Sequence, residues 1–256
     1  MEDETREKII KIYLDNVHGK KPDTSQYVQR HDGKEGYWLE KQMGVQPNAS
    51  NAPDLLGFEM KNHTNTVLTL GSWDPNYWVF RNKDNGINRD DFLKIFGQSN
   101  PKKNGRYSWS GKPVPKIDGV NSFGMEIKID QEKNISFVYS YSKDQRIEKE
   151  SIVPNNLQVE NLEIARWNVD GKKSLKEKVE QKFNQYGWFK CLQNKVGEYN
   201  SIVFGQPFTF DTFIRYFLNG DVYFDCGMYQ GNARNYCQWR TKNTFWDSLI
   251  TYRFPE

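Results

Sequence analysis

One short segment of the chain carries side chains whose types and spacing suit metal-dependent chemistry. It reads Pro53-Asp54, then a short apolar stretch, then Glu59-Met60-Lys61. In an extended strand, side chains two residues apart point to the same face, so Glu59 and Lys61 are expected to lie together. Asp54 precedes them in a turn, from which its carboxylate can converge with that of Glu59. These two carboxylates and the backbone carbonyl of Met60 are oxygen ligands of the kind Mg²⁺ prefers.

Such a group of side chains suits the hydrolysis of a phosphodiester bond. A divalent cation stabilises added negative charge on phosphate and makes hydroxide available near neutral pH. Lys61 is then a candidate to orient or deprotonate the attacking water, or to neutralise charge at phosphorus. Glu40 lies on the preceding expected helix and can act as a second metal ligand, directly or through water. The alternative is a surface Asp followed by an exposed Glu–Lys edge, because the pattern is short.

The residues around this segment predict the elements that hold it. Periodic apolar residues predict a helix over 4–17, with Ile10, Tyr13, Leu14 and Val17 on one stripe. A second, shorter helix is expected over 36–44, ending at the glycine. Residues 55–60 predict a buried strand after the Pro-Asp turn. A Glu–Lys pair within a strand that is otherwise apolar is costly, which favours a functional role for it.

Farther along, the chain predicts a mixed α/β fold with mostly antiparallel hairpins. Residues 74–116 are rich in Gly, Pro and Asn and predict a long irregular stretch with one weak helix near 90–96. The length suits one large domain or two packed lobes. The remaining expected elements are strands over 67–70, 123–130, 134–141, 188–192, 201–204 and 221–229, and helices over 174–183 and 208–218.

Charge is unevenly distributed although the net charge is only +3. Residues 101–116 and 226–246 contain basic side chains and no acidic ones. Local basic stretches in a nearly neutral chain fit a polyanion-binding surface, and solvated loops are the alternative for each stretch alone. The cations are Lys102, Lys103, Arg106, Lys112 and Lys116 in the first stretch and Arg234, Arg240 and Lys242 in the second.

Composition excludes several other classes of protein. An aromatic content of 15% excludes a mainly disordered chain. No run approaches the roughly 18 apolar residues of a membrane span, and the acidic N-terminus is unlike a secretory signal. Three cysteines without CxxC spacing and only three histidines argue against a structural zinc site. We expect a reduced, cytoplasmic location.

The segment around Asp54 resembles the PD-(D/E)xK nuclease superfamily. More narrowly, the chain is similar to the MvaI/BcnI type II restriction endonucleases, which are related to the mismatch-repair nickase MutH. The similar blocks cover nearly the whole chain in the same order, with thin similarity between them. They are residues 36–40, 52–54, 58–63, 67–70, 123–130, 199–201 and 219–222, followed by Asp225.

The resemblance implies a PD-(D/E)xK restriction-endonuclease-like core in a two-lobed protein with a central DNA-binding cleft. A catalytic lobe is expected mainly over 1–165 and a recognition lobe mainly over 166–256, with an approximate boundary and lobes that can interleave. Asp54, Glu59 and Lys61 take the catalytic positions, and Glu40 takes that of the helix glutamate. The implied cofactor is Mg²⁺. The implied partners are duplex DNA and a cognate DNA methyltransferase, with the enzyme acting as a monomer or a DNA-induced dimer.

In the family, a strand–loop–strand near the C-terminus reads bases in the major groove, and 221–240 corresponds to it here. Asp225 and Arg240 fall on matching positions, while the loop between them differs, so specificity is not transferred. By hydrogen-bonding chemistry, Arg234 and Arg240 suit guanine, Asn235 or Gln238 suits adenine, and Asp225 suits cytosine. The alternatives are contacts to phosphates only, or an Asp225–Arg240 pair that braces the loop.

Other basic residues are expected to position the duplex without reading it. Lys102, Lys103 and Arg106 are candidates for phosphate contacts. His63 lies two residues beyond Lys61, where it can contact the scissile phosphate or support the site.

The sequence therefore predicts a Mg²⁺-dependent, site-specific endodeoxyribonuclease that leaves 5′-phosphates. The alternatives are a MutH-like repair nickase and a DNA-binding protein that does not cleave.

Overall fold

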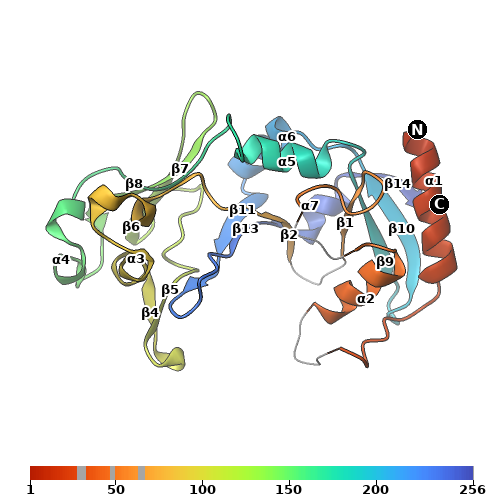
Figure 1. Ribbon diagram of the computed structural model, residues 1–256, viewed down its shortest axis with the longest axis horizontal. Helices are drawn as coiled ribbons and strands as arrows, with labels where there is room; N and C mark the ends of the chain where they lie inside the picture. Colours follow the sequence, from red (N-terminus) through yellow and green to blue (C-terminus); the bar gives the residue numbers. More distant parts are fainter. Residues whose placement is uncertain (28–32, 47–49, 63–66, 256) are drawn as a thin grey trace. The chain divides into compact units, whose positions relative to one another are not determined.

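The structure, a computed structural model, describes residues 1–27, 33–46, 50–62 and 67–255. Its contacts divide the chain into two compact units, each built from separate segments (Figure 1). The first unit comprises Met1–Leu68, Val179–Thr209 and Lys242–Glu256, and the second comprises Thr69–Lys178 and Phe210–Thr241. The chain therefore passes from one unit to the other four times. The sequence placed one approximate boundary near residue 165 and allowed for interleaved lobes.

A four-stranded sheet forms the centre of the first unit. The strand β1 pairs in parallel with β9, and the other neighbours are antiparallel. Although β1 has only three residues, all three are buried. In sheet order the strands are β1 (Glu59–Lys61), β9 (Trp188–Gln193), β10 (Tyr199–Gly205) and β14 (Ile250–Phe254).

Helices α1 (Glu2–Asn16) and α2 (Lys34–Gln42) pack on this sheet (Figure 1). Both confirm the expected helices, because apolar side chains three or four positions apart form one buried face. Leu14, expected on that face, is instead 44% exposed. Gly44 follows α2 with φ +78°, a left-handed conformation that suits glycine. Two further helices contribute to this unit, α5 (Leu175–Phe183), which begins in the second unit, and α7 (Asn243–Asp247).

The second unit contains three small sheets joined by short helices. The expected hairpin of β6 and β7 is present and belongs to a four-stranded antiparallel sheet. In sheet order its strands are β3 (Tyr77–Trp78), β8 (Leu162–Trp167), β7 (Ile135–Asp144) and β6 (Phe123–Ile129). A second sheet has the order β12 (Met228–Tyr229), β5 (Arg106–Trp109) and β4 (Gln98–Asn100). The third has the order β11 (Val222–Cys226), β13 (Cys237–Lys242) and β2 (Val67–Ser72). The helices are α3 (Arg89–Phe96), α4 (Lys149–Ile152) and α6 (Phe210–Leu218), with 3-10 turns at Val79–Arg81, Lys83–Asn85, Pro101–Lys103 and Asn155–Leu157.

Aromatic rings form much of the core of the second unit. Trp167, for example, lies 4.9 Å from both Phe137 and Phe224 between ring centroids. Trp78 and Trp109 are fully buried and pack edge-to-face at 5.7 Å. These rings supply the apolar burial that a chain with few aliphatic residues needs, since each aromatic side chain buries a large area.

Two expectations about local structure were wrong. The strand expected over 55–60 begins only at Glu59, because Leu55 and Phe58 close a tight turn with reciprocal backbone hydrogen bonds of 2.9 and 3.0 Å. Residues 74–116 are more ordered than expected. They contain β3, α3, β4 and β5, whose strands have four residues or fewer and are too short for a period-two pattern to show. No helix in the described part of the chain is long and apolar enough to cross a membrane.

A buried ion pair ties β7 of the second unit to its surroundings. Arg146 binds the carboxylate of Asp144 through Nε and Nη2, at 3.0 and 2.6 Å, and donates from Nη1 to the carbonyl of Ile95. Tyr139 also donates to Asp144, at 2.9 Å. Burial alone would raise the pKa of Asp144, but the hydrogen bonds and charge of Arg146 lower it below its ordinary value.

We expect Arg146→Met to lower the free energy of unfolding by about 3–5 kcal/mol near neutral pH, because it leaves Asp144 buried without its cation. A carboxyl whose pKa is lowered by folding contributes its stability above the unfolded-state pKa, near 4, and that stability is lost as pH falls through the folded-state pKa. Denaturant titrations of both proteins across acidic pH test this. The control is Lys143→Met, which removes a half-exposed partner of Glu126 and should cost less than about 1 kcal/mol.

Candidate active site

The strand β1 brings Glu59 and Lys61 together, as their spacing predicts. The two side chains are 2% and 6% exposed, and Lys61 Nζ donates to Glu59 Oε1 at 2.8 Å. The side chain of Met60 points the other way, into the core beneath α1 and α2. This alternation places a charged pair on the face of β1 opposite the apolar core.

The turn before β1 places Asp54 beside the strand. Asp54 Oδ2 accepts a hydrogen bond from the backbone N–H of Met60 at 3.0 Å, six residues later. Leu56 and Gly57, at φ +50° and +85°, reverse the chain between them. A side chain on Gly57 would also collide with Gln185 and Tyr186, so glycine is required there on both grounds.

Glu40 faces the same region from α2. Its Oε1 accepts from Asn62 Nδ2 at 3.2 Å. Burial raises the pKa of Glu40, an effect that the bond from Asn62 opposes and the charge of Asp54 reinforces. Asn62 escaped the sequence analysis. No local signal marked this contact, because Glu40 and Asn62 lie 22 residues apart.

Lys182 is a further residue of the site that the sequence analysis missed. It lies near the end of α5, and its Nζ is 2.8 Å from the same Glu59 oxygen that Lys61 binds. Charged residues throughout α5 indicated only a solvated helix, so no local signal marked Lys182. Lys190 was also missed; it pairs in register with Lys61 from β9 and is buried.

These contacts set the protonation preferences of the central pair. Burial raises the pKa of Glu59, and the charges of Lys61 and Lys182 oppose that effect. Burial lowers the pKa of Lys61, with the charge of Glu59 acting against it. The rings of Phe183 and Trp246 lie 5.2 and 5.8 Å from Lys61 Nζ, which keeps this ammonium in largely apolar surroundings.

The site has the donors for a divalent cation. Glu59 Oε2 is buried and has no hydrogen-bond partner within the described part of the chain. Burial and, to a smaller extent, the negative charge of Asp54 raise the pKa of both Glu40 and Glu59, so Asp54 acts on each of these two carboxyl groups. Within the described ranges no three acidic, histidine or cysteine side chains already enclose a metal position. In this structure the balancing charges on Glu59 are instead the ammonium groups of Lys61 and Lys182.

Of the expected base-reading residues, three lie together on β11 and β13 in the second unit. Asp225 pairs in register with Gln238, and Tyr223 with Arg240. Arg240 Nε lies 2.7 Å from Asp225 Oδ2, and its Nη2 donates to Gln238 Oε1 at 2.6 Å. One face of this two-stranded ribbon is buried, and these four partly exposed side chains form the other. Tyr223 was not singled out from the sequence.

The other two expected readers differ in exposure. Asn235 is only 8% exposed, donates to Asp74 Oδ2 at 3.1 Å and accepts from Arg89 Nε at 3.0 Å. Each end of its amide thus has a partner within the second unit, and base reading by Asn235 stays a prediction. Arg234 is exposed, and its guanidinium lies over the ring of Tyr236 at 4.9 Å.

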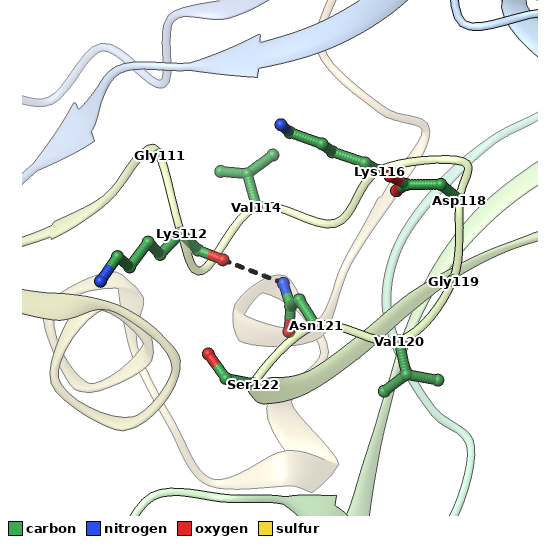
Figure 2. Close-up of a pocket in the computed structure, with 9 residues that line it drawn as sticks. All are labelled: Gly111, Lys112, Val114, Lys116, Asp118, Gly119, Val120, Asn121 and Ser122. Atoms are coloured by element: carbon green, nitrogen blue, oxygen red, sulfur yellow. Dashed lines mark hydrogen bonds between the residues drawn. The ribbon is translucent and has the colours of Figure 1, made fainter.

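The basic stretch forms the turn between β4 and β5 and the loop that follows. Lys102 and Lys103 are exposed in the 3-10 turn, and the guanidinium of Arg106 lies 3.9 Å from the centre of the Tyr229 ring. Farther on, Lys112 and Lys116 line a pocket of about 610 Å³ formed by residues 111–122 (Figure 2). The hydrogen bond from Asn121 to the Lys112 carbonyl closes this loop on itself. His63 lies outside the described residues.

The fold of the chain has a counterpart among solved structures. The structure is similar to that of restriction endonuclease MvaI, solved in complex with its cognate DNA substrate, with a TM-score of 0.61 and 15% sequence identity over 98% of this chain and 96% of that chain. This likeness confirms the expected mixed α/β fold.

Sequence similarity identifies the particular family. Residues 17–254 match the model of the LlaMI restriction endonuclease family. The chain is also 43% identical over 263 residues to the type II restriction enzyme ScrFI of Lactococcus lactis subsp. cremoris. The aligned region covers 96% of this chain and 97% of that protein. The chain therefore belongs to the LlaMI restriction endonuclease family, and the type II restriction enzyme class expected from the sequence is confirmed.

Lys182→Met should lower the free energy of unfolding by about 1–3 kcal/mol, because the buried Glu59 loses one of its two charged hydrogen-bond partners. Denaturant unfolding monitored by tryptophan fluorescence measures the change. Lys176, exposed on the same helix, supplies the matched control as Lys176→Met. Equal stability of the two variants would show that Lys182 does not stabilise Glu59 in solution.

Proposed function

We propose that the chain is a Mg²⁺-dependent endonuclease that cleaves duplex DNA at a specific sequence and leaves 5′-phosphates. The observation that carries the proposal is the convergence of Asp54, Glu59 and Lys61 at β1, next to Glu40, in a member of a restriction endonuclease family. The Oε2 atom of Glu59 is buried and has no hydrogen-bond partner in the part of the chain that the structure describes, which supports a cation at this place.

Asp54, Glu59 and the backbone carbonyl of Met60 are the groups that would hold Mg²⁺, with Glu40 as a direct or water-mediated partner. When bound, the ion supplies charge stabilisation at the phosphate and lowers the pKa of water. Asn62 holds the carboxylate of Glu40 in place through its 3.2 Å hydrogen bond.

Lys61 is the residue best placed to act on the attacking water. Its lowered pKa and its 2.8 Å contact with Glu59 suit an amine that orients a water, accepts its proton or neutralises charge at phosphorus. The water oxygen forms a new bond to phosphorus as the bond to the 3′ oxygen breaks. The products are then a 5′-phosphate and a 3′-hydroxyl.

The two proposed roles follow the two compact units. The catalytic residues lie in the first unit, and the expected DNA contacts other than His63 lie in the second. Asp225, Gln238, Arg240 and Arg234 are proposed to read bases, and Lys102, Lys103 and Arg106 to bind phosphates. This assignment places the 102–106 stretch in the recognition unit, although the sequence grouped it with the catalytic lobe. Several expectations stay predictions: the central cleft, a contact from His63, a cytoplasmic location, a partner methyltransferase, and a monomer or DNA-induced dimer.

Glu59→Ala and Lys61→Ala should each reduce plasmid cleavage in Mg²⁺ by about 10²–10³-fold or more, because each removes a group that acts on developing charge. Both variants should still bind the cognate site in Ca²⁺, as a gel-shift assay can show. The cognate site is found first by sequencing the ends of plasmid fragments produced by the wild-type chain. Nicked circles instead of discrete fragments would favour a repair nickase, and specific binding without any cleavage would favour a DNA-binding protein that does not cleave.

Arg240→Ala and Lys103→Ala should differ in kind. Loss of Arg240 should cost about 1–3 kcal/mol of discrimination at one base pair, because it removes a directional contact to a base edge. Loss of Lys103 should weaken binding to all sequences and reduce the salt slope of the affinity by about one. Competition binding against single-base variants at several salt concentrations measures both effects. Identical behaviour of the two variants would contradict the assignment of Arg240 as a base reader.

A further inference from the structure

The loop between β12 and β13 is held by a side chain from α3. Arg89 Nε donates to Asn235 Oδ1 at 3.0 Å, Nη1 to the carbonyl of Tyr229 at 3.3 Å and Nη2 to the carbonyl of Arg234 at 3.2 Å. One guanidinium therefore joins both ends of the loop. Because its donors form a rigid planar fork, the acceptors must keep fixed relative positions to satisfy all three bonds.

Asn235 extends this contact into the body of the second unit. Its Nδ2 donates to Asp74 Oδ2 at 3.1 Å, and the same oxygen accepts from Arg81 Nη2 at 2.9 Å. Asn235 is nearly buried, so both of its hydrogen bonds are shielded from water. The network thus links α3, the loop and the segment after β2.

Arg89 is itself firmly placed. It is the first residue of α3, directly after a capping box in which Asn88 accepts from the backbone of Asp91 and the Asp91 side chain accepts from that of Asn88. The helix is anchored by the buried rings of Phe92 and Phe96. The donors of Arg89 therefore project from a rigid support.

The remainder of the loop is also held by hydrogen bonds within the chain. Asn232 Nδ2 donates to the hydroxyls of Tyr229 and Tyr236, at 2.8 and 3.2 Å. Gln230 Oε1 accepts from the backbone N–H of Tyr107 at 2.9 Å. Arg234 is left exposed at the outer part of this fixed loop.

We propose that Arg89 is a positioning residue for sequence specificity: with Asn235 it fixes the conformation of residues 229–236 and so the direction from which Arg234 meets DNA. This inference rests on the proposed function. A loop that is already ordered loses less conformational entropy on binding its correct site. It also cannot rearrange to satisfy a wrong base, so a mismatch leaves polar groups unpaired.

The first test needs no DNA. Amide hydrogen exchange of residues 229–236 is compared in the full-length wild type, Arg89→Met, Arg89→Lys and a control, Lys94→Met, which alters an exposed residue on the same helix. Arg89→Met should exchange about tenfold faster or more in this loop, because it loses charged hydrogen bonds. Lysine, with no planar fork, should give an intermediate rate, and Lys94→Met should match wild type. Equal protection in Arg89→Met and wild type would overturn the proposal.

The second test measures specificity in Ca²⁺, with the cognate duplex mapped as above and duplexes carrying one substituted base pair. The ratio of cognate to mismatched affinity should fall about tenfold in Arg89→Met, less in Arg89→Lys and not at all in Lys94→Met. Weakening of all duplexes by one factor would overturn the role in specificity, because it would indicate a general contact or lost stability. A wild-type chain that binds no duplex would overturn the proposed function as well, whereas the exchange result reports on the Arg89 contact independently of DNA.

Discussion

A carboxylate buried at the edge of the central sheet is the constraint on which the candidate active site depends. Glu59 is only 2% exposed, and a buried charge is very costly unless it is paired, so it needs cations as partners. Lys61 from its own strand and Lys182 from α5 both bind one oxygen of this carboxylate, and the other has no hydrogen-bond partner among the described residues. The positions of α5 and β1 are therefore coupled through the charge of Glu59. The second oxygen of this carboxylate is where a divalent cation would bind.

The turn before β1 extends this constraint to the other acidic groups. Because Leu56 and Gly57 adopt left-handed conformations, the chain reverses within four residues and Asp54 returns alongside Met60. A longer or looser turn would leave Asp54 in solvent, away from Glu59. The pattern of Asp and Glu separated by a short spacer thus has a structural reason: the spacer is the turn that returns Asp54 to the strand that carries Glu59.

In the second unit, contacts between polar side chains set the direction of the exposed groups on the β11–β13 ribbon and in the loop before β13. On the ribbon, Asp225 and Arg240 satisfy each other while remaining partly exposed, so they are ordered and still accessible. In the loop, the hydrogen bond from Arg89 to Asn235 holds the chain in the same way. The alternative in which Asp225 braces Arg240 is present in this structure, and it is compatible with base reading because a braced guanidinium keeps a defined direction.

Strand periodicity predicted that Glu59 and Lys61 share a face, and apolar spacing predicted α1 and α2. The resemblance predicted the restriction-endonuclease class. All three predictions succeeded because they depend on residues close in sequence or on the order of motifs. The start of β1 and the short strands after residue 74 were missed, since turns and strands of a few residues leave no periodic signal. Lys182 and the Arg89–Asn235 pair needed the tertiary structure. Their partners lie more than a hundred residues away, and only the packing of helices against sheets decides which distant side chains meet.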